Sequence, residues 1–166
     1  MMFSKGKRSK KSPAASPKKS IVFHDGLSVL ADELQLAIKW DRPSVLLVVH
    51  KARSGQGIVQ TALQRELAKL GQTIKRFELK DTSADMIPGM IRHFPRGDRT
   101  VYFFSHLGRK EKNKDGKDTY RALNLCRETF VENRIRAIFW LTLGEASDLP
   151  SFAPDFWAFR HRVVDF

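Results

Sequence analysis

The chain has 166 residues, of which 42% are hydrophobic and 29% charged, and this is the size and composition of one globular domain with a sizeable core. No stretch approaches the roughly 18 to 20 apolar residues of a membrane span, and the basic start MMFSKGKRSKKS is not followed by the apolar region of a secretory signal. A single cysteine, Cys126, excludes an internal disulfide and a thiolate-rich metal site. We therefore expect a cytoplasmic protein with no membrane partner.

The formal net charge of +12 is distributed unevenly along the chain. Residues 1–20 hold seven of the 30 basic residues and no acidic one, whereas the other 23 basic residues stand against 18 acidic ones. This segment has almost nothing apolar to bury, so it is predicted to be a disordered basic tail, followed by a single α/β domain at residues 21–166. Such a tail suits weak contact with nucleic acid or another polyanion, and a merely solvated tail is the alternative.

The first half of the domain begins with a helix and an apolar strand. Residues 27–40 space their apolar side chains as a helix does, and residues 44–49 form a strand of Val and Leu without polar alternation, which is typical of a parallel strand covered on both faces. Residues 50–57 are predicted to form a short basic turn. The next helix is expected to bury five apolar residues, which are Ile58, Ala62, Leu63, Leu67 and Leu70.

The second half continues the alternation of strands and helices. Further strands are predicted at residues 73–80, 100–105, 136–142 and 163–166. Helices begin near Asp85 and Asp118, and the second of them is expected to bury Leu123, Cys126, Phe130 and Val131. The whole pattern predicts a three-layer α/β/α fold with a mainly parallel five-stranded sheet.

The turn at residues 50–57 is the candidate ligand site. A phosphate-binding loop has the pattern G-x-x-x-x-G-K-[ST], in which the Lys contacts the phosphates and the hydroxyl holds Mg²⁺. With Gly55 at the second glycine, His50, Gln56 and Gly57 occupy the other defining positions, so the Lys and the hydroxyl are missing. The turn could still hold ATP, ADP or another phosphate ligand without Mg²⁺. The predicted cofactor-binding residues are Lys51, Arg53, Ser54, Gly55, Gln56, Gly57 and Thr142.

Hydrolysis of a nucleotide would need acidic residues at the end of the strand at residues 100–105. That strand runs instead into Ser105 and His106. We therefore predict no catalytic residue and no metal ligand, and the five histidines show no metal-ligand spacing. Thr142, at the end of the fourth predicted strand, is either a polar sensor of a ligand or a hydroxyl that caps the next helix.

Three segments, ALNLCRE (122–128), AIFWLT (137–142) and DLPSFAPDFWAFRHRVVDF (148–166), resemble the N-terminal domain of certain large bacterial proteins. In those proteins a P-loop ATPase-like domain of the STAND/AAA type, often with an eroded phosphate loop, precedes a lid and tetratricopeptide repeats. The resemblance covers residues 25–166, and this sequence ends before the lid and the repeats. It implies a RecA/AAA-like sheet with the strand order 5-1-4-3-2, and protein partners in a larger assembly.

These observations together predict a non-hydrolytic, degenerate P-loop-like module for binding or interaction. One alternative is a nucleic-acid-associated protein that uses residues 1–20 and the charged loop 109–117. Another is an enzyme that uses His50 and His106, because both follow strands and are expected to lie near each other at the carboxyl edge of the sheet.

Overall fold

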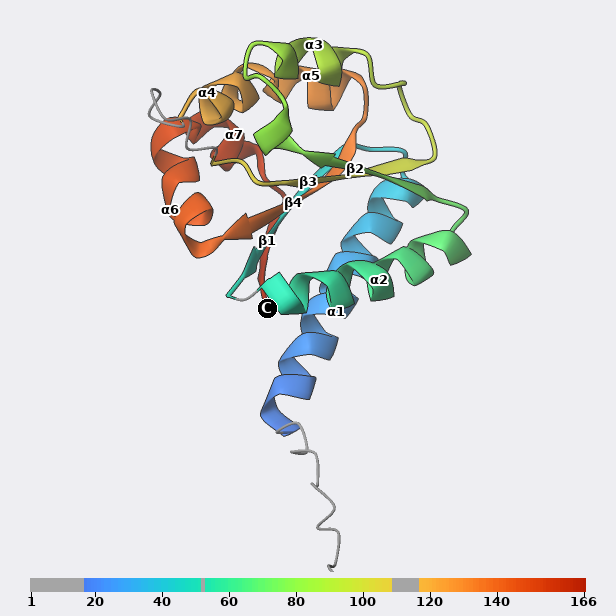
Figure 1. The fold of residues 1–166 in the computed structure, drawn as a ribbon. Coiled ribbons are helices and arrows are strands. Elements are labelled where there is room, and N and C mark those ends of the chain that lie inside the picture. Colours follow the sequence, from blue (N-terminus) through green and yellow to red (C-terminus); the bar gives the residue numbers. More distant parts are fainter. Residues whose placement is uncertain (1–16, 52, 109–116) are drawn as a thin grey trace, which may run out of the picture.

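A five-stranded parallel sheet forms the centre of the fold, with the strand order β2-β3-β4-β1-β5 (Figure 1). The computed structural model describes residues 17–51, 53–108 and 117–166. The strands are β1 (Ser44–His50), β2 (Thr73–Glu78), β3 (Thr100–Ser105), β4 (Arg136–Thr142) and β5 (Arg162–Asp165). Every neighbouring pair is parallel. The strand order that the resemblance implied is therefore confirmed.

Helices cover both faces of this sheet, which confirms the predicted three layers (Figure 1). One face carries α1 (Pro17–Lys39) and α2 (Arg53–Lys69). The other carries α3 (Met86–Arg92), α4 (Asp118–Leu125), α5 (Arg127–Glu132), α6 (Leu143–Phe152) and α7 (Pro154–Phe159), and a short 3-10 turn, η1 (Leu79–Asp81), follows β2. None of the described helices is both long and apolar enough to cross a membrane.

The core is divided between these two faces. On one side Phe104, Phe139 and Phe156 pack under α3 to α7, and on the other Trp140 and Leu63 pack under α1 and α2. The central strands β1, β3 and β4 are buried almost throughout because helices cover them on both sides, whereas the edge strand β2 is largely exposed.

The buried face of α2 differs from the predicted one. Val59, Leu63 and Leu67 are buried, because their four-residue spacing places them on one side of the helix. The predictions for Ile58 and Leu70 are wrong, since these side chains are 64% and 38% exposed.

Two other boundaries also differ from expectation. α1 begins at Pro17, so residues 17–20 belong to a helix, while residues 1–16 of the predicted tail lie outside the described residues. The helix after Asp118 is interrupted at Cys126 and continues as α5. This interruption changes the direction of the following side chains, so Phe130 is buried but Val131 is 42% exposed.

Candidate functional site

α2 begins almost immediately after β1. The strand ends at His50 and the helix begins at Arg53, so only two residues join them. Gly55 and Gly57 lie inside the helix without a positive φ, and a Cβ atom at either position would meet nothing within 4 Å. Neither glycine is needed for a turn or for a close approach. The prediction of a turn over residues 50–57 is therefore wrong, since its second half is helical.

The structure distributes the other predicted ligand residues differently from a phosphate loop. The backbone N–H of Lys51 donates to the carbonyl oxygen of Phe166 at 3.4 Å, so it does not face a ligand. Arg53 and Ser54 form the first turn of α2, and their side chains lie outside the described part of the chain. No acidic residue offsets the positive end of the helix dipole in this turn, so some attraction for an anion persists there.

A small hollow lies beside the start of α2, at the carboxyl ends of β1, β3 and β4. Its volume is about 10 Å³, which is room for about one water molecule. The residues that line it are His50, Gln56, Ser105, His106, Trp140, Thr142 and Glu145. The chain thus brings together both histidines of the enzyme alternative and two of the predicted ligand residues, Gln56 and Thr142.

Thr142 and Glu145 bond to each other at the start of α6. The backbone N–H of Glu145 donates to the Thr142 hydroxyl at 3.3 Å, and Glu145 Oε2 accepts from the Thr142 backbone N–H at 2.8 Å. The other carboxylate oxygen accepts from the Gly108 N–H at 3.1 Å. Thr142 therefore acts as a helix cap. Glu145 was not among the predicted residues, although the spacing T-x-x-E is the signature of this capping box.

Two aromatic side chains near this hollow, Trp140 and Tyr120, carry buried polar groups that have no hydrogen-bond partner among the described residues. Trp140 is 1% exposed, and its Nε1–H has no hydrogen-bond partner among the described residues. An indole N–H can only donate, so this group needs an acceptor such as a water oxygen in the hollow. The buried Tyr120 hydroxyl is also without a partner in the described part of the chain. Burial, and then the nearby Glu145 carboxylate, raise the pKa of Tyr120.

Ser105 and His106 form an adjacent pair that suggests reaction chemistry. Ser105 Oγ and His106 Nδ1 share a hydrogen bond of 3.1 Å, and His106 has a φ of 59°. A nucleophile of this kind needs a base that a third group orients, but the Glu145 oxygens are bonded to Gly108 and Thr142 instead. Within the described residues no group of three or more His, Cys, Asp or Glu could hold a metal ion.

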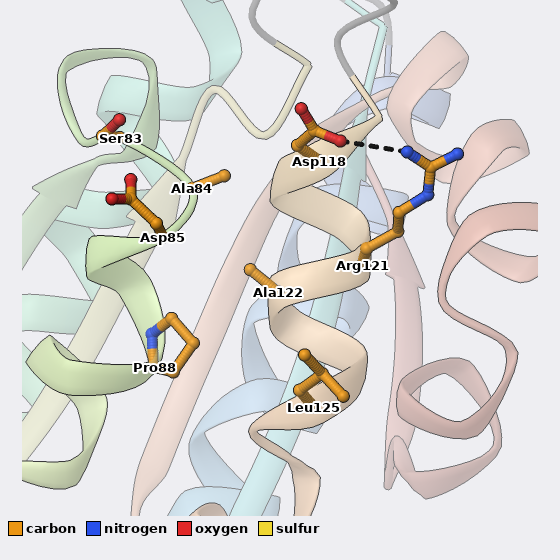
Figure 2. A pocket seen from close by; sticks show the side chains of 8 residues that line it. All are labelled: Ser83, Ala84, Asp85, Pro88, Asp118, Arg121, Ala122 and Leu125. Carbon is orange, nitrogen blue, oxygen red and sulfur yellow. Dashed lines mark hydrogen bonds and ion pairs between the residues drawn. The ribbon is translucent and has the colours of Figure 1, made fainter.

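A larger hollow of about 460 Å³ lies between α3 and α4. Figure 2 shows Ala84 and Pro88 on one side of it and Ala122 and Leu125 on the other. Asp118 and Arg121 also line it and form an ion pair at 3.0 Å. The remaining lining residues are Ser83 and Asp85. This volume is within the range of about 300 to 1,000 Å³ of ligand pockets. No sequence pattern predicted it.

The comparisons with known proteins bear on the fold. No protein-family model matches the sequence, and no curated protein matches it. Among solved structures, the chain is similar to the Thermotoga maritima RuvB Holliday junction branch migration motor, with a TM-score of 0.56 and 13% identity over 86% of this chain and 44% of that one. It is also similar to a chain of the E. coli MS115-1 HORMA:CdnC:Trip13 complex, with a TM-score of 0.52 and 9% identity over 90% of this chain and 60% of that one.

These similarities show a P-loop AAA-like α/β fold. The chain spans less than two thirds of the length of either structural neighbour.

Proposed function

We propose that this chain is a non-hydrolytic binding domain with an AAA-like fold, which recognises a ligand or a protein partner without turning over a nucleotide. The observation that carries the proposal is the two-residue connection between His50 and Arg53, which leaves no loop to surround a phosphate chain. Ser105 and His106 at the end of β3 add to it, because carboxylates for Mg²⁺ and for water would be needed there.

The bonding within the carboxyl edge also supports a binding role. Glu145 accepts hydrogen bonds from two backbone N–H groups, and Thr142 caps α6. The buried Trp140 lines the same hollow as both residues. The Glu145 and Thr142 side chains are thus engaged within the protein rather than with a bound substrate.

Two exposed apolar side chains at the same edge favour a protein partner. Ile58 in the second turn of α2 is 64% exposed, and Leu143 at the start of α6 is 59% exposed. Both helices start at the carboxyl ends of central strands, and α6 contacts β1. Burying either side chain in an interface would contribute about 1.5 to 3 kcal/mol. One structural neighbour belongs to a complex of several proteins, which is consistent with such a role for this fold.

Weak, metal-independent contact of ATP, ADP or another phosphate with the start of α2 is the second candidate function. The positive end of the helix dipole and the exposed Lys51 favour it. An anion there would lie at the protein surface, because the hollow beneath is too small to hold a phosphate group.

Thermal unfolding with ATP, ADP and GTP, each with and without Mg²⁺, tests both candidates. A ligand at 100 times its Kd that binds only the folded state adds about 2.7 kcal/mol of stability, which is visible as a raised midpoint. We expect no release of phosphate from ATP and no shift that requires Mg²⁺. A Mg²⁺-dependent shift or measurable hydrolysis would contradict the proposal.

A matched pair of variants locates any metal-independent shift. Lys51→Gln removes the charge beside the start of α2, and Lys75→Gln removes the same charge from an exposed position on β2. Binding at α2 predicts that the first variant reduces the shift and the second leaves it intact. Equal effects of the two variants would rule out a site at this helix end.

A further inference from the structure

A basic surface lies at the amino edge of the sheet, on the side opposite to the candidate site. Because all five strands are parallel, the loops that lead into them meet at one edge. The loops into β1, β3 and β4 are residues 40–43, 93–99 and 133–135, and in Figure 1 they lie away from α6 and from the start of α2. These loops contain four arginines and two acidic residues; Lys39, Arg136 and Glu132 flank them.

Hydrogen bonds join the three loops into one surface. The backbone N–H of Gly97 donates to the carbonyl oxygen of Asn133 at 3.1 Å, and Arg136 Nη1 donates to the carbonyl oxygen of Asp98 at 3.0 Å. Arg136 Nη2 also forms an ion pair with Asp41 at 3.0 Å. These bonds, most of which involve backbone atoms or the buried Arg136 side chain, keep the three loops next to one another.

The acidic side chains of these loops are already engaged. Asp41 pairs with Arg134 and Arg136. Asp98 accepts two hydrogen bonds of 2.8 Å, from the backbone N–H and the hydroxyl of Thr100. In contrast, three exposed arginines of the loops have no ion-pair partner within residues 17–51, 53–108 and 117–166, and these are Arg42, Arg96 and Arg99. The surface thus presents positive charge that the described protein does not neutralise.

An exposed aromatic ring lies among these charges. Trp40 is 66% exposed, and Lys39 Nζ is 5.4 Å from the centroid of its ring. Beside β5, burial lowers the pKa of His161, and the charge of Arg42 lowers it further, while the charge of Glu33 raises it. Arginines around an exposed aromatic ring are the combination with which proteins bind single strands, since the charges meet phosphates and the ring stacks on a base.

We propose that this basic edge, formed by Lys39, Trp40, Arg42, Arg96 and Arg99, binds single-stranded nucleic acid. The arginines contact successive phosphates, and one base stacks on Trp40. β4 separates β3 from β1, so the amino ends of these two strands lie about 10 Å apart, and the site spans a few nucleotides. In a duplex the bases stack on one another, so no base face is open to the indole of Trp40, and a single strand is the better ligand. The site is at the edge opposite to the proposed ligand site and does not depend on it.

The test is fluorescence anisotropy of a labelled oligothymidylate of about 15 nucleotides with the full chain, between about 50 and 200 mM salt. In Arg42→Gln/Arg99→Gln we expect weaker binding and a logarithmic salt slope that is shallower by about 1.4, because each phosphate contact on a single strand contributes about 0.7. Trp40→Ala should weaken binding by about 5- to 150-fold, the value of one stacked base, at an unchanged slope.

Two controls separate this surface from the rest of the basic chain. Arg65→Gln/Lys75→Gln removes the same charge from exposed positions on α2 and β2, and it should leave affinity and slope near those of the wild type. A tail variant replaces Lys5, Lys7, Arg8, Lys10 and Lys11 by Gln, and Trp40→Ala should still weaken binding in it. Thermal unfolding checks that the variants fold, and Arg96→Gln alone serves if the double variant does not.

Several results would overturn the proposal. One is no binding of the oligonucleotide at about 50 mM salt. Another is wild-type binding by Arg42→Gln/Arg99→Gln together with loss of binding in the tail variant, which would assign the contact to the tail. Competition by polyglutamate as strong as that by unlabelled oligonucleotide would assign the surface to an acidic protein. None of these results changes the nucleotide-dependent unfolding midpoints, so a failure here is distinct from a failure of the proposed function.

Discussion

Replacing Asp41 by Asn should destabilise the protein, because it leaves a buried arginine without its counter-ion. Asp41 pairs with Arg134 and with Arg136, whose side chain is 5% exposed. Asp41 has a φ of 44°, in the left-handed region, and Asn tolerates this region as well as Asp does. The substitution therefore removes the charge without adding backbone strain.

The magnitude follows from the burial of the two partners. Removing one member of a fully buried ion pair costs about 3 to 5 kcal/mol. The Asp41 side chain is 49% exposed, so water can replace part of its contact, and Arg136 retains its hydrogen bond to the Asp98 carbonyl oxygen. We therefore expect Asp41→Asn to cost about 2 kcal/mol, which lowers the melting temperature of a domain of this size by about 4 to 8 °C.

Urea unfolding followed by tryptophan fluorescence measures this change. The double variant Asp41→Asn/Arg136→Met also removes the cation that the single substitution leaves without a counter-ion, so it should be more stable than Asp41→Asn alone. A single variant within about 0.5 kcal/mol of the wild type would refute the reasoning. So would a double variant whose loss equals the sum of the two single losses.

Three further predictions concern single side chains. Thr142→Val removes the capping box with Glu145 and should lower the unfolding free energy by about 1 kcal/mol; an unchanged urea midpoint would show that the cap is unimportant. His161 Nδ1 accepts a hydrogen bond of 3.0 Å from the Val45 N–H, and burial lowers the pKa of His161. The unfolded chain then binds the proton at a higher pH than the folded one, so stability falls as the pH falls below about 6.5, and less steeply in His161→Gln. Burial raises the pKa of Cys126 to about 11, so the folded protein should not react with a thiol reagent near neutral pH until urea unfolds it, and rapid reaction of the native protein would contradict its burial.

The central strands were predictable because their sequences leave little choice. The segments of β1, β3 and β4 are apolar at every position between their first and last residues, and this pattern is typical of parallel strands covered on both faces. The edge strand β2 is more polar, and its predicted end at residue 80 instead belongs to the turn η1. The alternation with helices then determined the three layers.

The local structure around the glycines could not be predicted in the same way. Gly55 and Gly57 favour a turn by propensity. α2 nevertheless includes both, because the helix gains its stability from burying Val59, Leu63 and Leu67 against the sheet. Ile58 was wrongly predicted as buried because it is apolar and directly precedes Val59, so it also fits the helical spacing of the buried residues.

The candidate site was predictable only in part. The positions of His50 and His106 at the ends of two parallel strands predicted that both lie at the carboxyl edge, and the structure shows both in one hollow. Trp140 was not identified because an apolar strand residue is ordinarily only part of the core. The three arginines of the basic edge come from two loops, residues 40–43 and 93–99, and only the strand order reveals that these loops meet.

The central claim is that residues 53–57 form the start of a helix rather than a phosphate loop, and alanine substitution tests it most directly. In a helix with open space around the Cβ position, Gly55→Ala and Gly57→Ala should each stabilise the protein by about 0.5 to 1 kcal/mol in urea unfolding. Gly71→Ala is the control, because Gly71 has a φ of 67° and its substitution should cost about 1 to 2 kcal/mol. A loss of stability in Gly55→Ala as large as that in Gly71→Ala would contradict the claim, since it would show a left-handed loop at this position.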